Sequence, residues 1–391
     1  MSNQPIFAGR SQARETFRAQ RLAAKSPVRH VDLSLLVTTM LLTTFGAVAI
    51  YWASRVRLEA EGVDPQYLLK RHLIYAAVAF GVFVASIFID YRQYRTLAPL
   101  LLGVGVLMLL VVLTPIGHSA KGAQRWIDIG AFRIQPSEPM KVLLLIALAS
   151  LLSGEDKQRS APATVGLAMA VTAAPAGLIF LQPDLGTVMV LFAIVFAILV
   201  LAGVPIRWLG LVLAVGAAAM IFAVQLDLLK EYQVARLYAF LDSSSDPSSS
   251  GFNLAQSKIA IGSGGFAGKP LSEATQTNLA YVPSQHTDFI FTVIGETKGF
   301  VGAMVVIGLF GLLLWRSLRI AMLSKDLFGS LVAGGIAAMF AFQVFVNIGM
   351  TVGIMPITGI PLPFVSFGGS SLITNYLAMG LLMNIHMRRF L

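Results

Sequence analysis

Residues 186–203 read GTVMVLFAIVFAILVLAG, an apolar run without a charged side chain. An α-helix needs roughly 20 such residues to cross the hydrocarbon core of a bilayer. The rest of the chain has the same character, since 56% of its 391 residues are hydrophobic and only 12% are charged. A water-soluble surface of this size needs far more charge. The sequence therefore predicts a membrane protein and excludes a soluble one.

Apolar blocks on both sides of this run predict about ten helical spans in all. The fourth block is short and the eighth has a polar first half, so both need protein neighbours around their polar positions. We expect an all-α polytopic membrane protein with a single transmembrane domain at 32–387, preceded by a basic tail at 1–31. The candidate spans are 32–53, 72–89, 97–114, 138–152, 162–181, 186–203, 205–226, 289–315, 327–346 and 370–386.

The distribution of basic residues predicts that both termini are cytoplasmic. Cytoplasmic loops are enriched in Lys and Arg, and this orientation places more than half of the 29 Lys and Arg on the inner side. The formal charge of +10 is then explained by anionic lipid headgroups, and no nucleic-acid partner is expected. The inner cations are Arg10, Arg14, Arg18, Arg21, Lys25, Arg29, Arg92, Arg95, Lys157, Arg159, Arg207, Arg316, Arg319, Lys325, Arg388 and Arg389.

The tail itself has two interpretations. The stretch from Arg10 to Lys25 is either a basic helix lying on the inner leaflet or a basic tail without regular structure. Composition does not separate the two. No cleavable signal peptide is expected, because the first apolar block is long enough to remain as an anchor.

Four segments fall on the outer face in this orientation: 115–137, 182–186, 227–288 and 347–369. The loop at 227–288, between the seventh and eighth spans, is the only extended region outside the membrane. A loop of this length in a compact bundle is more often functional than not. The segment 347–369 is dense in Pro and Gly, so we expect irregular backbone that lines a cavity.

Several kinds of site are excluded. The chain has no cysteine and therefore no disulfide or thiolate ligand. Its five histidines are scattered, and none forms the spaced pair of a zinc site. The sequence also lacks a Walker A motif, a dinucleotide-binding glycine pattern and a nucleophile elbow.

Charged residues near span ends indicate where a polar cavity lies. Glu138 and Lys141 are three residues apart and share one helix face. They form either a structural ion pair or part of a cavity wall. Asp184, in QPDLGT at 182–187, is placed to cap the sixth span, and a role in lining the cavity is open in addition. Near the interface, Lys121 and Arg125 offer cations for an anionic group such as a pyrophosphate.

The sharpest signal is PSQHTDFIF at 283–291, where a polar loop ends directly on an apolar helix. Asp288 lies at this junction on the outer side. Its carboxylate is either an N-cap or a general base beside a cavity, and chemistry alone does not separate the two. Glu296 and Lys298, about two turns further on, are either buried partners or lining of the same cavity.

Seven motifs along the chain, in order and with the right spacing, resemble the SEDS proteins of shape, elongation, division and sporulation. The resemblance extends from about residue 32 to the C-terminus. One of the seven, QSKIAIGSGG, looks more like the elongation member RodA than the division member FtsW. The motifs are GAQRWIDIG (122–130), QPSEPMK (135–141), QPDLGT (182–187), YQVARLYAFLD (232–242), QSKIAIGSGG (256–265), QHTDFIF (285–291) and GIMPITGIPLPFVSFGGSS (353–371).

The resemblance implies a peptidoglycan glycosyltransferase that polymerises lipid II during cell elongation. The growing glycan is transferred from undecaprenyl pyrophosphate onto the sugar 4-hydroxyl of another lipid II, with inversion at the anomeric carbon. Asp288 matches the family's essential acidic residue, the proposed general base. Glu138, Lys141 and Asp184 match its cavity residues, and we also assign His286 and Glu296 to the cavity. A bound divalent cation, magnesium or manganese, is an open possibility without a clear ligand set.

The family also implies a place in the cell and a partner. Such proteins lie in the bacterial cytoplasmic (inner) membrane with the active site on the outer face, among the membrane lipids and the membrane proteins of the elongation complex. They work with a class B penicillin-binding protein, a transpeptidase that cross-links the new glycan. We expect such a partner to contact the outer loop and neighbouring span ends.

The chain departs from the family pattern at a few positions. Ser284 stands where a glutamate is common, Glu296-Thr297-Lys298-Gly299 replaces Glu-Glu-Leu-Gly, and Gly268-Lys269-Pro270 replaces Gly-Lys-Gly. These changes bear on loop packing and partner contact. Three alternatives stay open: a flippase for the lipid-linked sugar, a division-type member of the family, and a scaffold without chemistry.

Overall fold

The structure is a computed structural model that describes residues 30–120, 123–130, 132–154, 160–241, 250–279 and 281–390. Four predictions fall outside these residues: the tail between Arg10 and Lys25, the cations Lys157 and Arg159 of one inner loop, and Lys121 of the outer face.

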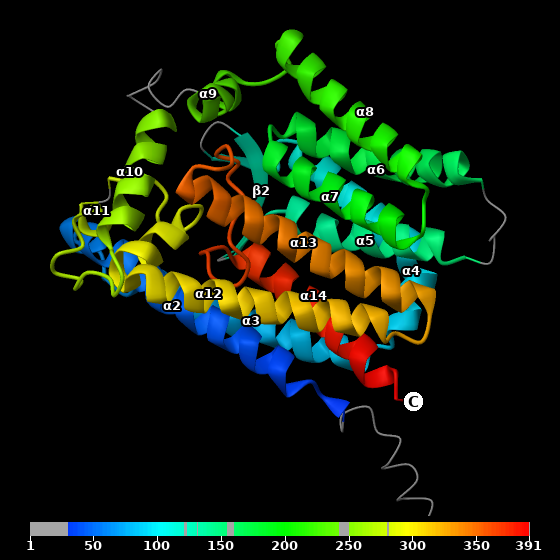
Figure 1. Cartoon of the computed structure of the whole chain (residues 1–391), viewed down its shortest axis with the longest axis horizontal. Helices are drawn as coiled ribbons and strands as arrows, with labels where there is room; N and C mark the ends of the chain where they lie inside the picture. Colours follow the sequence, from blue (N-terminus) through cyan, green and yellow to red (C-terminus); the bar gives the residue numbers. More distant parts are fainter. Residues whose placement is uncertain are drawn as a thin grey trace, which may run out of the picture.

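In the part of the chain that is described, ten helices occupy the ten predicted spans and run side by side (Figure 1). Seven of them are long and apolar enough to cross a membrane. The all-helical polytopic fold is therefore confirmed, with seven to ten spans. The ten helices are α2 (Leu33–Ala60), α3 (Tyr67–Phe88), α4 (Tyr91–Val112), α5 (Ser137–Leu152), α6 (Ala161–Leu181), α7 (Leu185–Leu201), α8 (Ile206–Gln225), α12 (Ile290–Met322), α13 (Leu327–Val352) and α14 (Gly369–Arg388).

Aspartates mark the starts of several of these helices. The carboxylate of Asp32 accepts from the backbone N–H of Leu35, and Asp90 and Asp326 cap α4 and α13 in the same way. The first N–H groups of a helix have no partner within it, and a capping Asp stabilises the helix by about 1 kcal/mol. These caps determine where the chain turns back into the membrane.

The helices differ in how deeply they are buried. Two-thirds of the most apolar window of α13 is buried inside the protein, while α8 buries only Val212 and Ala223. α13 packs against α12, α7 and α5, and α14 packs most extensively on α3. The core therefore lies around α13 and α14, and α8 lies at the edge of the bundle (Figure 1).

The outer segments fold into more structure than the sequence predicts. A small antiparallel sheet, in the order β1-β2-β3, is made by β1 (Gly117–Ala120), β2 (Ala123–Ile129) and β3 (Phe132–Ile134), with Asp128 paired with Arg133. The long loop contains α9 (Glu231–Leu241), α10 (Ser250–Ser263) and α11 (Thr275–Asn278). In Figure 1, α10 and α11 lie at one end of the bundle and the C-terminus lies toward the other.

The glycine-rich stretch after α10 packs against an interruption in α12. Gly299 has φ +59 and ψ −156 inside α12, and its neighbours Phe300 and Val301 donate N–H bonds to Gly265 and Phe266. A Cβ on Gly264 would overlap the carbonyl oxygen of Gly295. The glycines therefore serve close packing of the loop on α12.

Several expected boundaries are wrong. α3 and α4 begin at Tyr67 and Tyr91, before the expected 72 and 97, which puts Arg92 and Arg95 on a helix rather than in a loop. The segment 347–369 was expected to be irregular throughout, but α13 continues to Val352 and ends at Gly353, whose left-handed φ of +86 terminates the helix. The irregular part is 353–368. α2 and α12 likewise continue to Ala60 and Met322, which puts Arg316 on a helix rather than in a loop.

Candidate active site

A cavity of about 780 Å³ opens between the small sheet, the long loop and the span ends. Segments far apart in sequence meet there: β2, the starts of α5 and α7, α9, the turn before α12, and the irregular segment after α13. Its charged and polar lining includes Arg125, Arg133, Gln135, Glu138, Lys141, Asp184, Thr187, Tyr232, Gln233, Arg236, Ser284, Thr287, Asp288 and Ser371.

Glu138 and Lys141 form a buried ion pair in the wall of this cavity. Lys141 Nζ lies 2.8 Å from Glu138 Oε2, and the two residues are only 1% and 3% exposed. The two side chains lie one helical turn apart, so their opposite charges attract each other. This attraction offsets part of the free-energy cost of removing both charges from water. Both predicted roles therefore coincide, since the residues are paired and also line the cavity.

Asp184 caps α7, as predicted, and its two oxygens hold several donors together. Oδ1 accepts from the backbone N–H of Thr187 at 3.2 Å, and Oδ2 accepts from the Thr187 hydroxyl at 3.0 Å and from Gln135 Nε2 at 3.2 Å. The side chain thus joins the start of α7 to the residues before α5.

Arg125 anchors the corner between α6 and α7. Its guanidinium donates to the carbonyl of Gln182 at 2.9 Å and to that of Pro183, and it lies 3.8 Å from Asp184 Oδ1. Most of its donors are therefore already engaged. This leaves Arg125 in the cavity wall but less available for a pyrophosphate than the sequence suggests.

Arg133 and Arg236 are cavity cations that were not singled out from the sequence. Arg133 donates from Nε to Asp128 at 2.8 Å, and this hydrogen bond lowers the pKa of Asp128. Arg236 packs over the ring of Tyr232, with 5.5 Å between the guanidinium carbon and the ring centroid, and has no ion pair within the described residues. The motif YQVARLYAFLD was the available signal for Arg236, but spacing alone could not show which of its residues face the cavity.

Asp288 lies in the lining of the cavity, one residue before the helix cap. α12 begins at Ile290 and its N-cap residue is Phe289, which makes no side-chain capping bond. Asp288 therefore stands one position before the N-cap residue of α12, in the turn that leads into the helix. Asp288 and Arg236 both approach Gly359. A Cβ atom built on this glycine would lie 3.6 Å from Asp288 Oδ2 and 3.6 Å from Arg236 Nη1.

Hydrogen bonds from the buried helix α13 and the irregular segment position the turn that carries Asp288. Asn347 Nδ2 donates both to the carbonyl of Asp288 at 2.9 Å and to that of Ile360 at 2.7 Å. Ser366 donates to the carbonyl of Thr287 at 2.6 Å. The two most conspicuous outer motifs are thus joined into one unit.

Two predicted cavity residues lie outside its lining. Glu296 is fully buried and accepts from the backbone N–H groups of Gln276 and Thr277, at 3.0 and 2.8 Å, which stabilises the start of α11. It is a structural residue, the first of the two roles considered for it. The ring of His286 lies 5.9 Å from that of Phe367, behind the cavity wall.

Among the residues that the structure describes, no three His, Asp or Glu side chains gather into a metal site. The three cavity carboxylates are spread over the wall, and Glu138 and Asp184 already accept from protein donors. A three-carboxylate set for magnesium or manganese does not fit these residues. A hydrated Mg²⁺ is instead commonly held by one or two carboxylates and substrate phosphates.

Comparison with known proteins places the chain in one family. The sequence model of the FtsW, RodA and SpoVE cell cycle proteins matches residues 32–390. The chain is 41% identical to the probable peptidoglycan glycosyltransferase FtsW of Trichlorobacter lovleyi, over 90% of this chain and 92% of that protein. It is 38% identical to the peptidoglycan glycosyltransferase MrdB of Escherichia coli, over 92% and 94%.

Solved structures agree. A chain from a peptidoglycan synthase complex matches with a TM-score of 0.77 at 32% identity, over 92% of this chain and 98% of that one. The rod shape-determining protein RodA of Thermus thermophilus matches with a TM-score of 0.68 at 31% identity, over 92% and 98%. The similar identities to FtsW and to MrdB do not separate division from elongation members, so the expected likeness to RodA in particular is not established. The chain belongs to the SEDS family of bacterial multi-pass membrane proteins, the FtsW, RodA and SpoVE cell cycle proteins.

Proposed function

We propose that this peptidoglycan glycosyltransferase polymerises lipid II in the outer cavity, with Asp288 as the general base. The observation that carries the proposal is the presence of the Asp288 carboxylate in one cavity with Lys141, Arg125 and Arg236. A carboxylate beside cations suits a reaction that removes one proton from a sugar alcohol and releases an anionic pyrophosphate.

In the proposed step, Asp288 takes the proton from the 4-hydroxyl of the acceptor sugar. The oxygen then forms a bond to the anomeric carbon of the donor, and the bond from that carbon to the pyrophosphate oxygen breaks. The electron pair leaves with undecaprenyl pyrophosphate, and the configuration inverts. General-base action of this kind typically contributes about 10²–10⁴-fold in rate.

Arg236 is the cation best suited to bind the leaving pyrophosphate. A guanidinium matches phosphate oxygens with two parallel donors, and the donors of Arg125 are engaged with backbone carbonyls. Lys141 is held by Glu138. Arg236 also approaches the same face of Gly359 as the Asp288 carboxylate, so base and anion-binding group lie on one side of the cavity.

The test is polymerisation of purified lipid II by the purified full-length protein, read as glycan chains on a gel. We expect Asp288→Asn to reduce polymer at least 100-fold, since the amide preserves shape but accepts no proton. Asp64→Asn is the matched control, because Asp64 is an exposed outer-side carboxylate paired with Lys70 and outside the cavity lining. Equal activity of wild type and Asp288→Asn would remove the assignment. Lipid II translocation without any polymer would favour a flippase.

The proposal places the cavity on the outer face of the cytoplasmic membrane. Supporting this, Asp288 precedes the start of α12, whereas Arg316 and Arg319 lie near its other end. Cations near helix ends are typical of the cytoplasmic side. Labelling of a cysteine introduced at Asp64 by a membrane-impermeant maleimide on intact cells tests this orientation, and labelling only after lysis would contradict it.

We propose further that the chain acts in elongation, with a class B penicillin-binding protein as its partner. The motif at 256–265 supports an elongation role, and the similarity to a chain of a peptidoglycan synthase complex supports a partner. Rescue of an elongation-deficient strain, with no rescue of a division-deficient one, is expected. The reverse result would assign a division role.

A further inference from the structure

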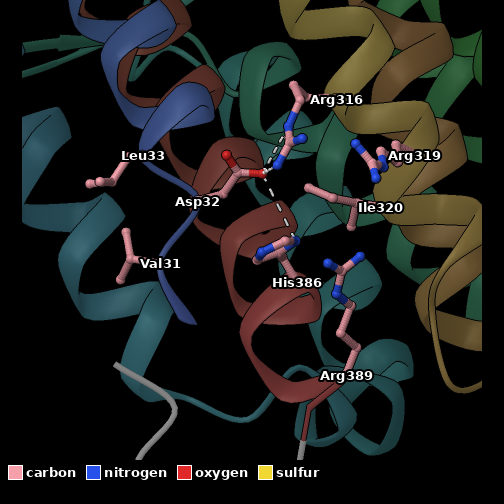
Figure 2. Close-up of a pocket in the computed structure, with 8 residues that line it drawn as sticks. All are labelled: Val31, Asp32, Leu33, Arg316, Arg319, Ile320, His386 and Arg389. Atoms are coloured by element: carbon pink, nitrogen blue, oxygen red, sulfur yellow. Dashed lines mark hydrogen bonds and ion pairs between the residues drawn. The ribbon is translucent and has the colours of Figure 1, made fainter. Parts of the chain in front are cut away.

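A second cavity, of about 370 Å³, lies at the opposite end of the bundle from Asp288. It is formed where the start of α2 meets the far ends of α12 and α14 (Figure 2). Its lining is Val31, Asp32, Leu33, Arg316, Arg319, Ile320, His386 and Arg389. None of these residues takes part in the reaction proposed above.

The cavity carries more positive charge than its own carboxylate neutralises. Asp32 accepts from Arg316 at 3.0 Å through Nε, and also from its NH2 group. Within the described part of the chain, Arg319 and Arg389 have no ion pair. Burial, followed by the charges of Arg316 and Arg319, lowers the pKa of Arg389. Two guanidinium charges therefore have no counter-ion among residues 30–390 as far as the structure describes them.

Buried polar atoms in the cavity also lack hydrogen-bond partners among the described residues. His386 is only 7% exposed, and its Nδ1 makes no hydrogen bond, being 3.9 Å from Asp32 Oδ2. Arg389 Nε is likewise buried without a partner. Figure 2 shows His386 pointing toward Asp32, with Arg319 and Arg389 beside them. A buried donor without a partner lowers the stability of the folded protein, so an acceptor that enters the cavity would recover that loss.

The surroundings are those of a membrane interface. The Trp315 side chain is 54% exposed, and the guanidinium carbons of Arg316 and Arg319 lie 5.6 Å from its ring centroid. Tryptophan collects at the level of lipid headgroups. Leu33 lines the cavity and is 69% exposed, which gives its rim an apolar side. A ligand with both a charged group and apolar chains fits such a place.

We propose that this cavity binds the phosphate group of an anionic phospholipid of the inner leaflet, with Arg319, Arg389 and His386 as its donors. Basic pockets between spanning helices on the cytoplasmic side bind lipid phosphates by this chemistry. Free phosphate shares the chemistry, but the apolar rim favours the lipid.

The chain's own tail is a poor occupant of the cavity. Residues 1–29 contain six Lys and Arg but one carboxylate, that of Glu15. A segment with this balance is repelled by uncompensated guanidinium groups. The lipid phosphate brings the missing negative charge.

The experiment measures lipid retained by the full-length protein, by native mass spectrometry after release from nanodiscs of equal parts phosphatidylglycerol and phosphatidylcholine. We expect wild type to retain phosphatidylglycerol selectively. A basic residue near the membrane surface contributes about 1 kcal/mol to lipid binding, which is about fivefold per arginine. The double variant Arg319→Gln/Arg389→Gln should therefore retain roughly 25-fold less.

Arg207→Gln is the matched control, since Arg207 is an exposed cation predicted on the same side and lies outside the cavity. Its retention should equal that of wild type. Retention of the lipid by the double variant at the wild-type level, or no preference for phosphatidylglycerol over phosphatidylcholine, would overturn the proposal. A third arm adds inorganic phosphate at 100-fold excess over the lipid, and complete displacement would assign the site to free phosphate instead. Displacement by less than half would support the lipid.

Discussion

Asn347 donates from its side-chain amide to the backbone carbonyl of Asp288 at 2.9 Å, although Asn347 lies in α13 and Asp288 in the turn before α12. The same nitrogen donates to Ile360, so one buried amide holds both the turn with the acidic residue and the irregular segment opposite it. The proposed base is therefore positioned from the core of the protein and not from the flexible side of a loop.

Replacing Asn347 with alanine should lower kcat more than it raises KM. The amide does not line the cavity, but its loss frees the Asp288 turn. A misplacement of 1 Å can cost about 100-fold in rate. Steady-state kinetics with lipid II measures the split, and the melting temperature serves as its control. A variant with unchanged kcat would show that the turn is held by its other contacts.

Removing one partner of the buried ion pair should destabilise the protein more than removing both. Glu138→Gln leaves the Lys141 charge buried and unpaired, at a cost of about 3–5 kcal/mol. Glu138→Gln/Lys141→Met removes both charges and should recover much of this loss. Thermal unfolding in detergent compares the two variants. The single variant Lys141→Met is measured as well. If the destabilisation of the double variant equals the sum of the two single losses, the two residues are not coupled.

Arg236→Gln should lower kcat/KM for lipid II by roughly 10–100-fold, since a hydrogen bond to a charged group contributes about 1.5–3 kcal/mol. Arg236→Lys keeps the charge without the planar pair of donors and should lose less. The comparison is made by polymerisation at several lipid II concentrations. Full activity of Arg236→Gln would move the role of pyrophosphate binding to another cation, such as Arg133.

A pair of neighbouring glycines gives a matched test of the packing of the long loop. Gly264→Ala places a methyl group against the backbone of Gly295, whereas a Cβ on Gly262 meets nothing within 4 Å. We expect Gly264→Ala to lower the melting temperature and Gly262→Ala to leave it unchanged or raise it, because alanine is favoured over glycine in a helix by about 1 kcal/mol. Similar melting temperatures for both variants would mean that α10 shifts to accommodate the added methyl group without a loss of stability.

The spans could be predicted from the sequence because each is a long local pattern that neighbouring residues alone determine. The cap by Asp184 could be predicted for the same reason. The short strands could not, since segments of three to seven residues are too short to give a clear alternation of apolar and polar side chains. Arg236 lines the cavity because of the way α9 packs on the helical bundle. That packing depends on contacts between residues far apart in sequence.

Glu296 illustrates the opposite error. A charged residue inside an apolar helix suggests a polar cavity nearby, yet here its acceptors are used by the backbone of α11. Sequence shows that such a carboxylate must have partners, but it does not show whether they are substrate groups or peptide N–H groups.

The interruption at Gly299 divides α12 into two helical parts, and the long loop is bonded to both of them. Lys269 donates to the carbonyl of Glu296 before the interruption, while Phe300 and Val301 after it donate to the carbonyls of Gly265 and Phe266. In a continuous helix, the N–H groups of Phe300 and Val301 would bond to the carbonyls of Glu296 and Thr297. The loop therefore supplies backbone partners that the interruption removes, and a rearranged loop would leave these polar groups inside the bundle without hydrogen bonds.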